Sequence, residues 1–542
     1  MTQNWTTRHR LFPSLSDLVF STTLAFVFLF GQGATQLLRD SDTGWHIRTG
    51  DWILENFAVP RQDLFSFSKP GGEWFAWEWL SDVVFALVHR YAGLAGLVLL
   101  AALVISLVFT MLYRFMIRRG ANAPVAVALA LVASYAASVH WLARPHMFSW
   151  AFALAFYWIL EQTPAEKKRI FWLVPLTVLW TNMHGSFVLG LFLVGIYAAA
   201  ELATAALAPA GQATEIRRTS LARAARYGVL LAACSAASLV NPYLFRVHLH
   251  IFGYLQDSFI LNHIVEFFSP NFHFPATRFF EVLLFLGLGS ALWALRQGRY
   301  RQALLVLCFA HFGLQSARHI PLYAIFAAPV IATALGEGLA AHRRGTMARW
   351  LARLLASFER FSEGIGQIEA RPRVYATSGL VTLAVIGLLW APPAAAGKVQ
   401  DFRSRFDSQL FPVGAADYLV QTSFTGNIFT SDQWSSYLIY RTFPRIRVFM
   451  DGRSDYYGAE MGKLYLNLLS VHYTWQQTFD QYQVDWVLLR VNSGLAGALK
   501  ESARWKIAYD DGVAILFHRA GSAPAQLVAA VHGAHGRRQA IR

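Results

Sequence analysis

The sequence has few charged residues and few cysteines for its length. Charged side chains make up 15% of the 542 residues, whereas hydrophobic side chains make up 55%. A soluble protein of this size needs more charge to cover its surface, so the composition excludes a soluble globular protein and indicates a polytopic membrane protein. The two cysteines, Cys234 and Cys308, both lie inside apolar runs, which excludes a disulfide framework.

Acidic residues are also scarce: 32 Asp and Glu stand against 47 Lys and Arg, a net charge of +15. In a membrane protein the excess of Lys and Arg lines the cytoplasmic loops. We therefore expect membrane lipids, and no nucleic acid, as the partners of this charge. The sequence lacks a recognisable cleavable signal peptide, and we expect its first apolar run to be a membrane span.

Long apolar runs are abundant. Windows long enough to cross about 30 Å of hydrocarbon predict about eleven transmembrane helices. The windows begin near Leu18, Ala92, Ala123, Phe148, Phe171, Phe187, Tyr227, Phe279, Ala303, Pro321 and Ser378. Basic clusters occupy alternate loops, so the positive-inside rule places the N-terminus in the cytoplasm and the C-terminal region outside. We expect a plasma (inner) membrane protein whose C-terminal domain is periplasmic or otherwise extracytoplasmic.

The character of the chain changes after Trp390, which predicts two domains. Residues 1–392 are predicted to form a transmembrane domain, with a first outer loop at 39–82 and a cytoplasmic amphipathic helix at 343–373. This helix either lies on the leaflet as an interfacial helix or is a plain amphipathic linker, which we favour. Residues 393–542 have shorter apolar runs and more turns, which is typical of a mixed α/β domain. Within it we predict strands at 484–490 and 513–519, a hairpin turn at 509–512, and helices at 415–421 and 465–475.

Ionisable residues gather in the loops that the rule places outside. Each of them taken alone is more often structural than functional, but such residues near spans are costly and usually line a cavity. The spans are nearly bare of acids, unlike those of ion-coupled transporters, which favours an enzyme acting on a lipid head group. The candidates for binding a lipid phosphate or a sugar are His46, Arg144, His146, His184, Arg318 and His319.

The stretch RDSDTGWHIRTGDW at 39–52 directly follows the first span. Asp40 and Asp42 lie at the exit of that span, where a carboxylate can act as a general base or orient a nucleophile. Which of the two is the base depends on whether Ser41 lies on a helix or in a turn. We therefore keep both as candidate catalytic residues.

Two in-plane helices are predicted in the same outer loop. The first covers His46 to Phe57, and the second carries Glu78 and Asp82 four residues apart on one face. The expected membrane anchors of the first helix are Trp45, Ile47, Trp52 and Phe57.

This layout, an Asp-x-Asp motif between the first span and an in-plane helix pair, resembles the GT-C superfamily of glycosyltransferases over roughly residues 18–335. The superfamily includes oligosaccharyltransferases, protein O-mannosyltransferases and aminoarabinose transferases. The resemblance implies inverting transfer of a sugar from a polyprenyl-phosphate donor to a protein, lipid or glycan acceptor outside the cytoplasm. The charge of the leaving phosphate suits Arg144 and Arg318, because a guanidinium can grip phosphate with two hydrogen bonds.

A second resemblance lies at 427–458, which is similar to the region around the WWDYG motif in oligosaccharyltransferase catalytic subunits. The motif itself, which reads the acceptor sequon, is absent, and this puts N-linked protein glycosylation in doubt. The DGRSDYYG stretch at 451–458 is either a structural turn or part of an acceptor groove. The acceptor-side candidates are Asp432, Trp434, Tyr437, Asp451, Arg453 and Asp455.

Oligosaccharyltransferases hold a divalent ion with acids from several outer loops. Here the outer loop VHWLARPHM at 139–147 has no carboxylate, so Mg²⁺ or Mn²⁺ would be left with Asp40, Asp42 and Glu266. Enzymes that use monosaccharide-phosphate carriers work without a metal, and we expect the metal-free variety. Two alternative functions stay open: a flippase or polymerase for polyprenyl-linked glycans, and a non-catalytic membrane assembly factor.

Overall fold

The computed structural model describes residues 13–29, 33–209, 213–342, 349–369, 375–391 and 402–521. The chain forms two compact units. Unit 1 comprises Met1–Gln36, Val98–Leu244 and Ile264–Arg403, and unit 2 comprises Leu37–Leu97, Phe245–His263 and Ser404–Arg542. The sequence predicts a single boundary between residues 392 and 393. The compact units group the chain differently, because the first outer loop at 39–82 folds with the C-terminal region in unit 2.

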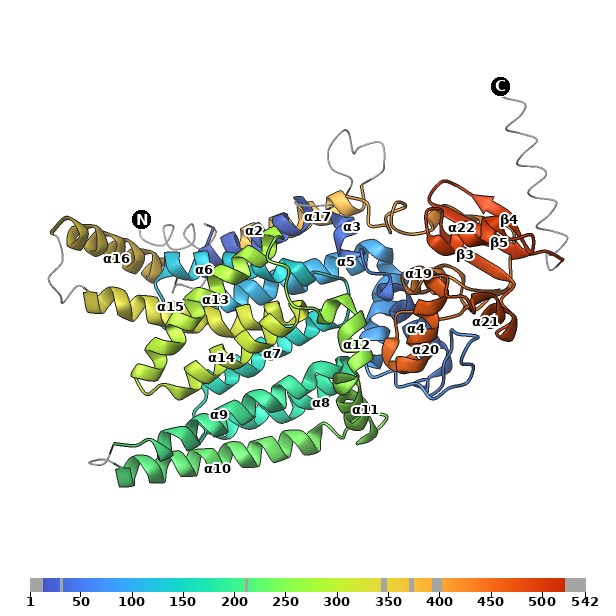
Figure 1. Ribbon diagram of the computed structural model, residues 1–542. Helices are drawn as coiled ribbons and strands as arrows, with labels where there is room; N and C mark the ends of the chain where they lie inside the picture. The colour runs from blue at the N-terminus through green and yellow to red at the C-terminus, as the bar shows by residue number, and fades with distance from the viewer. Residues whose placement is uncertain are drawn as a thin grey trace. The chain divides into compact units, whose positions relative to one another are not determined.

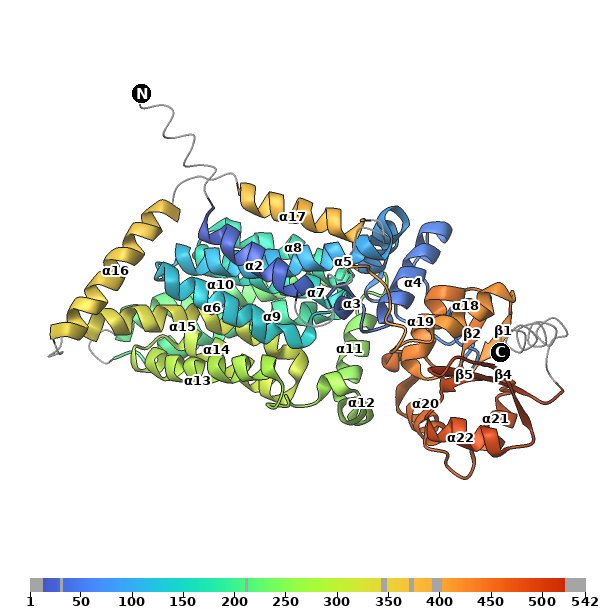
Figure 2. The same ribbon diagram turned by 90° about the horizontal axis from the view of Figure 1, so that it is seen from above.

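Unit 1 is helical throughout its described part. Figure 1 shows α8, α9 and α10 side by side, and Figure 2 shows the same for α13, α14 and α15. Its helices are α2 (Leu15–Leu29), the second half of α5 (Trp79–Arg118), α6 (Ala123–Ala137), α7 (His146–Gln162), α8 (Leu173–Met183), α9 (Val188–Ala206), α10 (Ala213–Ala237), α13 (Pro275–Arg296), α14 (Tyr300–Gln315), α15 (Ile320–His342), α16 (Arg349–Glu369) and α17 (Ala376–Leu389). Short 3-10 helices, η1 (Ser138–His140), η2 (Lys168–Trp172), η3 (Gly185–Phe187), η5 (Val265–Phe267) and η6 (Ala317–His319), adjoin them.

Five helices of the described chain are long and apolar enough to cross a membrane. They are Trp79–Arg118, Ala123–His140, Gly185–Ala206, Pro275–Arg296 and Ala317–Leu339, and the shorter α2 and α17 are also apolar. Each predicted apolar window begins within a helix or a 3-10 helix of the described chain. The number of about eleven spans stays a prediction, because helices such as α8, with 11 residues, are shorter than the roughly 20 that a span needs.

Small side chains let the central helices of unit 1 approach closely. The buried face of α6 carries Ala126, Ala130, Ala133 and Ala137, and α6 packs against α13 and α15. Stripes of small residues are typical of helix contacts within membranes, where van der Waals packing drives association. Because these alanines are buried against α13 and α15, α6 forms part of the core of unit 1.

The predicted amphipathic helix at 343–373 is confirmed as α16 over Arg349–Glu369. Residues 343–348 and 370–373 of that prediction lie outside the described residues. Trp350 and Phe361 are exposed on α16. Its attachment to a leaflet stays a prediction.

Unit 2 is a mixed α/β unit, as the sequence predicts for the C-terminal region. Its helices are α4 (Asp42–Asn56), the first half of α5, α11 (Arg246–Gln256), α12 (Ser258–His263), α18 (Val413–Gln421), α19 (Asp432–Thr442), α20 (Ser454–Leu469), α21 (Trp475–Gln481) and α22 (Gly494–Glu501). The four-residue α3 (Ala34–Leu37) precedes α4. Strands β1 (Gly426–Ile428) and β2 (Ile446–Val448) pair in parallel, and β3 (Trp486–Arg490), β5 (Ala514–Arg519) and β4 (Trp505–Asp510) form an antiparallel sheet in that order.

Single bridges join these two sheets and the first outer loop. Phe429 pairs with Val487, so β1 continues towards β3, and Ser66 pairs with Val448 at the end of β2. The strands predicted at 484–490 and 513–519 are confirmed as β3 and β5, and the predicted turn at 509–512 connects β4 to β5. The helix predicted at 415–421 is confirmed as α18. Only the first part of the helix predicted at 465–475 is helical, because α20 ends at Leu469.

Two predicted features of unit 2 are wrong. Trp45 and Ile47, predicted as membrane anchors, are buried within unit 2, because α4 packs against α19 along one face. The DGRSDYYG stretch is not one turn. Its first residues form a turn, and α20 begins at Ser454 with a kink at Gly458, where φ is 73°. A positive φ of this kind favours glycine.

Candidate functional site

The acidic motif lies at the N-terminus of α4. The helix begins at Asp42, and Ser41 is its N-cap with an α-helical backbone, so Ser41 belongs to the helix start. Oδ1 of Asp40 accepts a hydrogen bond from the Asp42 amide at 2.9 Å. A carboxylate at this place satisfies an amide that has no partner within the helix and interacts favourably with the helix dipole. The sequence therefore holds both acids at one helix end.

Asp42 is buried between two segments that follow it by about 400 residues in the chain. It is 5% exposed, and its Oδ1 accepts a hydrogen bond from the Ser436 hydroxyl of α19 at 3.2 Å. Gly452 lies against the same carboxylate, because a Cβ built on Gly452 would stand 2.0 Å from Asp42 Oδ1. The Gly452 amide in turn donates to the Ser436 hydroxyl at 3.3 Å. The two segments that carry the family resemblance, 39–52 and 427–458, thus meet at Asp42.

Asp40 is only partly buried and has a second acid in its neighbourhood. Burial raises the pKa of Asp432 above its ordinary value, and the negative charge of Asp40 adds to that rise. The Tyr465 hydroxyl lies 3.2 Å from Asp432 Oδ1, and the Gln433 amide donates to the same oxygen at 2.8 Å. The more accessible carboxylate of the motif is therefore Asp40, next to an acid that holds its proton more tightly than usual.

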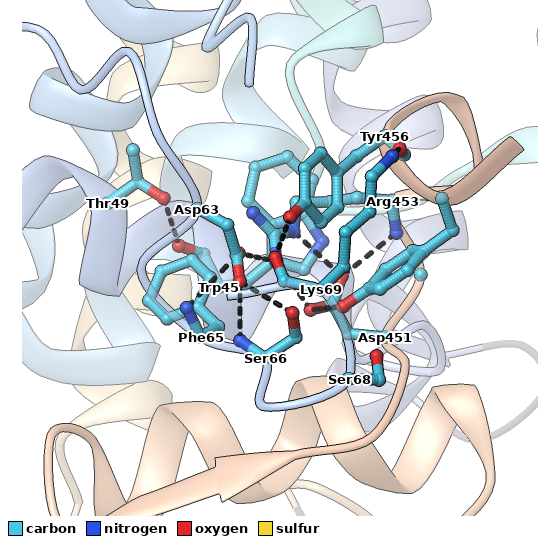
Figure 3. Close-up of polar contacts among 12 residues, drawn as sticks. Trp45, Thr49, Asp63, Phe65, Ser66, Ser68, Lys69, Asp451, Arg453 and Tyr456 are labelled. Atoms are coloured by element: carbon cyan, nitrogen blue, oxygen red, sulfur yellow. Dashed lines mark hydrogen bonds and ion pairs between the residues drawn. The ribbon is translucent and has the colours of Figure 1, made fainter. Parts of the chain in front are cut away.

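An ion cluster fixes the turn before α20 (Figure 3). Arg453 is 2% exposed and binds Asp451 with two nitrogens, Nε to Oδ1 at 2.8 Å and Nη2 to Oδ2 at 2.7 Å. The same Nη2 reaches Oδ1 of Asp63 in the first outer loop at 2.6 Å. Burial alone would lower the pKa of Arg453, but the two carboxylates outweigh it and the pKa rises well above its ordinary value. We therefore assign Asp451 and Arg453, predicted as acceptor-side residues, to the interior of unit 2.

Asp63 binds Arg453 but is not among the candidate residues predicted from the sequence. Its carboxylate also accepts hydrogen bonds from the Ser66 amide at 2.8 Å and hydroxyl at 2.6 Å. Burial would raise the pKa of Asp63, but the Arg453 charge and the Ser66 hydrogen bonds hold it below its ordinary value. In the sequence Asp63 is one acid of a polar loop, and its partner Arg453 lies 390 residues away, so no local pattern links them.

Aromatic rings surround the Arg453 guanidinium. Its Cζ lies 4.5 Å from the ring centroid of Trp74, 4.8 Å from that of Phe65 and 5.1 Å from that of Tyr456. Lys69 donates to the Tyr456 carbonyl at 2.6 Å and lies over the ring of the same residue. Figure 3 shows Phe65 and Lys69 of the outer loop close to Arg453 and Tyr456 at the start of α20. Cation–π contacts of this kind stabilise a desolvated guanidinium.

His46, predicted to bind phosphate or sugar, is buried in unit 2. Its Nδ1 lies 2.6 Å from Asp82 Oδ1, and its Nε2 lies 3.6 Å from Glu78 Oε2. The predicted placement of Glu78 and Asp82 on one side is thereby explained, since both face one imidazole. We assign His46 to the packing of α4 on α5, because its ring nitrogens point at two protein carboxylates.

The other three acceptor-side candidates differ in exposure. Trp434 and Tyr437 are each 2% exposed, and the Trp434 indole donates to the Leu410 carbonyl at 2.8 Å. We assign these two aromatics to the hydrophobic core of unit 2. Asp455 is partly exposed and lies 3.0 Å from His250 Nε2 of α11. Among the acceptor-side candidates, Asp432 and Asp455 are the two that are not fully buried.

Unit 1 contains a separate cluster of charged residues and histidines. Arg144 Nη1 lies 2.6 Å from Glu266 Oε1, and Arg318 Nη1 lies 3.9 Å from Glu266 Oε2. All three side chains are about one fifth exposed, at 21%, 22% and 24%. Burial would raise the pKa of Glu266, but Arg144, His140 and Arg318 lower it to about 2. The two predicted phosphate ligands, Arg144 and Arg318, therefore share the Glu266 carboxylate. Their guanidinium groups stabilise an anion at this position.

Three predicted histidines lie in or beside this cluster. His146 Nε2 donates to the His140 carbonyl at 3.0 Å, and the two rings lie 4.2 Å apart. His184 Nδ1 accepts from the Ser186 amide at 3.0 Å, and burial with the charges of Arg318 and Arg144 lowers its pKa to about 3. His319 adjoins Arg318 in η6. The structure thus brings together five of the six predicted donor-binding residues, while His46 belongs to unit 2.

The sequence leaves Asp40, Asp42 and Glu266 as the residues that could bind a metal ion. Among the residues that the structure describes, no group of three His, Cys, Asp or Glu side chains is arranged to hold a metal ion. Glu266, one of the three predicted ligands, faces two arginines in unit 1, whereas Asp40 and Asp42 lie in unit 2. Whether a metal takes part stays a prediction, and we derive no step through one.

Solved structures similar to this chain are oligosaccharyltransferases of Archaeoglobus fulgidus. The apo form is 10% identical, with a TM-score of 0.51 over 88% of this chain and 69% of that one. The AglB complex with an inhibitory peptide and a dolichol-phosphate is 11% identical, with a TM-score of 0.50 over 94% and 74%. The form tethered to an acceptor peptide with the NVT sequon is 12% identical, with a TM-score of 0.50 over 90% and 69%.

No family model and no curated protein matches this sequence. At such low identities the structural likeness concerns the fold. It extends over most of both chains. The chain therefore shares the fold of these oligosaccharyltransferases, which agrees, at the level of the fold, with the resemblance predicted from its sequence.

Proposed function

We propose that this protein transfers a sugar from a polyprenyl-phosphate donor to an acceptor on the extracytoplasmic side of the plasma (inner) membrane. The observation that carries the proposal is the packing of Asp42 against Ser436 and Gly452. It brings the acidic motif of the outer loop onto the C-terminal segment that resembles oligosaccharyltransferases. The shared fold and the apolar helices support a membrane glycosyltransferase in general, and the donor and the side belong to the proposal.

Asp40 and Asp42 have different roles in this proposal. Asp40 is partly exposed and acts as the general base, while Asp42 is buried and orients the helix end and the approaching nucleophile. The acceptor oxygen or nitrogen forms a bond to the anomeric carbon, and the bond from that carbon to the phosphate oxygen breaks with its electron pair. The acceptor proton passes to Asp40. A single displacement of this kind inverts the anomeric centre.

Arg144 and Arg318 bind the donor phosphate and stabilise the charge that it gains on leaving. Phosphate competes with the Glu266 carboxylate for these guanidinium groups, because both are anions that accept charge-assisted hydrogen bonds. His146, His184 and His319 contribute neutral hydrogen-bonding groups around them. The two arginines are the residues for which direct donor contact is proposed.

The acceptor is a protein, a lipid or another glycan. One similar structure holds an acceptor peptide and another a dolichol-phosphate. This chain lacks the motif that reads the asparagine sequon in such enzymes, so we propose an acceptor other than that sequon. Asp432 and Asp455 are the candidates for its binding.

The test is a transfer assay in proteoliposomes that contain the purified full-length chain and a radiolabelled polyprenyl-phosphate sugar. Membrane extract treated to remove endogenous donor supplies the acceptor. The proposal predicts label in the acceptor fraction and free polyprenyl phosphate in the lipid fraction. Unaltered sugar-lipid that changes leaflet would identify a flippase, growth of the lipid-linked glycan would identify a polymerase, and neither result would favour an assembly factor.

A further inference from the structure

Three hydrogen bonds to carboxylate oxygens fix the orientation of the Arg453 guanidinium. Asp451 binds Nε and Nη2 side by side, and Asp63 binds Nη2 from another chain segment. The Arg453 amide also donates to Asp451 Oδ1 at 3.1 Å. The turn Asp451–Gly452–Arg453 is therefore closed on itself and attached to the first outer loop.

The middle residue of this turn faces the acidic motif. Gly452 lies in contact with the Asp42 carboxylate, and its amide donates to the Ser436 hydroxyl that also donates to Asp42. A displacement of this turn therefore changes the contact between Gly452 and the Asp42 carboxylate. The geometry links Arg453 to Asp42 through one intervening residue.

Asp63 anchors the other end of this arrangement. It lies seven residues after the end of α4 and is fixed by the Ser66 amide and hydroxyl and by the Phe65 amide. Ser66 pairs with Val448, and the Phe67 amide donates to the Val448 carbonyl at 3.0 Å, so the loop is attached to β2 just before the turn. The chain thus returns from α4 to the turn that touches the start of α4.

We propose that Arg453 is a positioning residue for Asp42, acting through Gly452, with Asp63 as its anchor. This inference rests on the proposed function. The Arg453 side chain is 1% exposed, so it touches neither donor nor acceptor. Its contribution is to hold the acidic helix end where the acceptor is activated, and small displacements of such groups lower rates strongly.

Two conservative variants separate this role from general stability. In Arg453→Lys the positive charge is kept, but an ammonium cannot reproduce the paired hydrogen bonds of the guanidinium. In Asp63→Asn an oxygen acceptor is kept, but the anchoring charge is lost. The matched control is Arg504→Lys, which alters a half-exposed arginine that lies 2.7 Å from Asp480 in the same unit.

The first measurement is steady-state sugar transfer by full-length variants at equal amounts in proteoliposomes. We expect kcat to fall about tenfold or more in Arg453→Lys, and less in Asp63→Asn, with donor KM within about twofold of wild type. Arg504→Lys should match wild type in both. An unchanged kcat in the folded Arg453→Lys or Asp63→Asn protein would overturn the inference.

The second measurement needs no activity, so it separates failure of this inference from failure of the proposed function. Amide hydrogen exchange followed by mass spectrometry is compared between wild type and Arg453→Lys. We expect faster exchange at 448–453 and at 41–45, with no change in β4 and β5. If exchange at 41–45 is unchanged, Arg453 does not position Asp42, whether or not the wild type transfers sugar.

Discussion

Asp42 and Ser436 are hydrogen-bonded to one another across 394 residues of sequence, with the Ser436 hydroxyl 3.2 Å from Asp42 Oδ1. This bond joins the first outer loop to α19 within unit 2. The serine hydroxyl also accepts from the Gly452 amide, so three chain segments meet at one carboxylate. The geometry of the candidate acid Asp42 therefore depends on the C-terminal region.

The contact between Gly452 and Asp42 leaves no room for a side chain. In Gly452→Ala the new Cβ would lie 2.0 Å from Asp42 Oδ1, so the carboxylate or the turn must move. We expect sugar transfer to fall at least about tenfold, since a shift of about 1 Å is enough for such an effect. The measurement is the proteoliposome transfer rate. Gly497→Ala is the control, because nothing lies within 4 Å of a Cβ at that helical position, and equal rates for the two variants would contradict the arrangement.

The sequence predicts the helical membrane fold, the strands β3 and β5 and the gathering of Arg144 with Arg318, because these follow from local periodicity and from loop charge. It does not predict the partners of Asp42 and Arg453. Their contacts join segments about 390 residues apart, and no spacing rule connects them. Trp45 is an example of a local interpretation that fails, since tertiary packing buries an indole that local context places at the membrane surface.

Removal of one partner of the buried pair His46 and Asp82 should lower the stability of the folded protein. His46→Leu leaves the Asp82 carboxyl group buried without its imidazole, and a buried polar group that loses its hydrogen-bond partner typically costs about 1–3 kcal/mol. The double variant His46→Leu/Asp82→Leu should recover much of that loss. Thermal unfolding of the purified proteins measures both effects. Equal melting temperatures for wild type and His46→Leu would show that the pair contributes little.

Substitutions of Arg144 or Arg318 and of Glu266 should change the donor KM in opposite directions. Loss of either guanidinium, in Arg144→Gln or Arg318→Gln, should raise the donor KM about tenfold to a hundredfold, because hydrogen bonds to charged groups contribute about 1.5–3 kcal/mol. Glu266→Gln removes the anion that competes with phosphate and should lower the donor KM. Arg299→Gln, which breaks an exposed pair with Glu337, is the control. The same direction of change in Glu266→Gln and Arg144→Gln would refute competition for the arginines.

The cluster in unit 1 should also make stability depend on pH. The pKa of His184 is about 3 in the folded protein and 6.5 ordinarily, and that of Glu266 is about 2 rather than 4.5. In both cases the unfolded chain binds more protons within the window, so the free energy of unfolding falls as the pH drops. His184 acts between pH 6.5 and 3, and Glu266 between pH 4.5 and 2.

A substitution separates these two contributions. His184→Gln should flatten the decline in melting temperature between pH 6.5 and 4.5, because the new side chain takes up no proton on unfolding. Glu266→Gln should leave the decline in that window nearly unchanged. A melting temperature of the wild type that is constant from pH 6.5 to 4.5 would contradict the neutral, buried state of His184.

The central claim is that the acids at the start of α4 carry out sugar transfer, and it is tested most directly by the transfer rate of Asp40→Asn and Asp42→Asn. Each protein is reconstituted at equal amounts with the labelled polyprenyl-phosphate sugar, beside Asp51→Asn, which alters a partly buried acid of α4 that pairs with Arg48 and Arg90. We predict that Asp40→Asn loses transfer by about a hundredfold or more, as removal of a general base does. Asp42→Asn should lose it by about a hundredfold because the helix end and the nucleophile are no longer oriented, while Asp51→Asn keeps it. Folded Asp40→Asn and Asp42→Asn proteins that both transfer sugar at the wild-type rate would contradict the account.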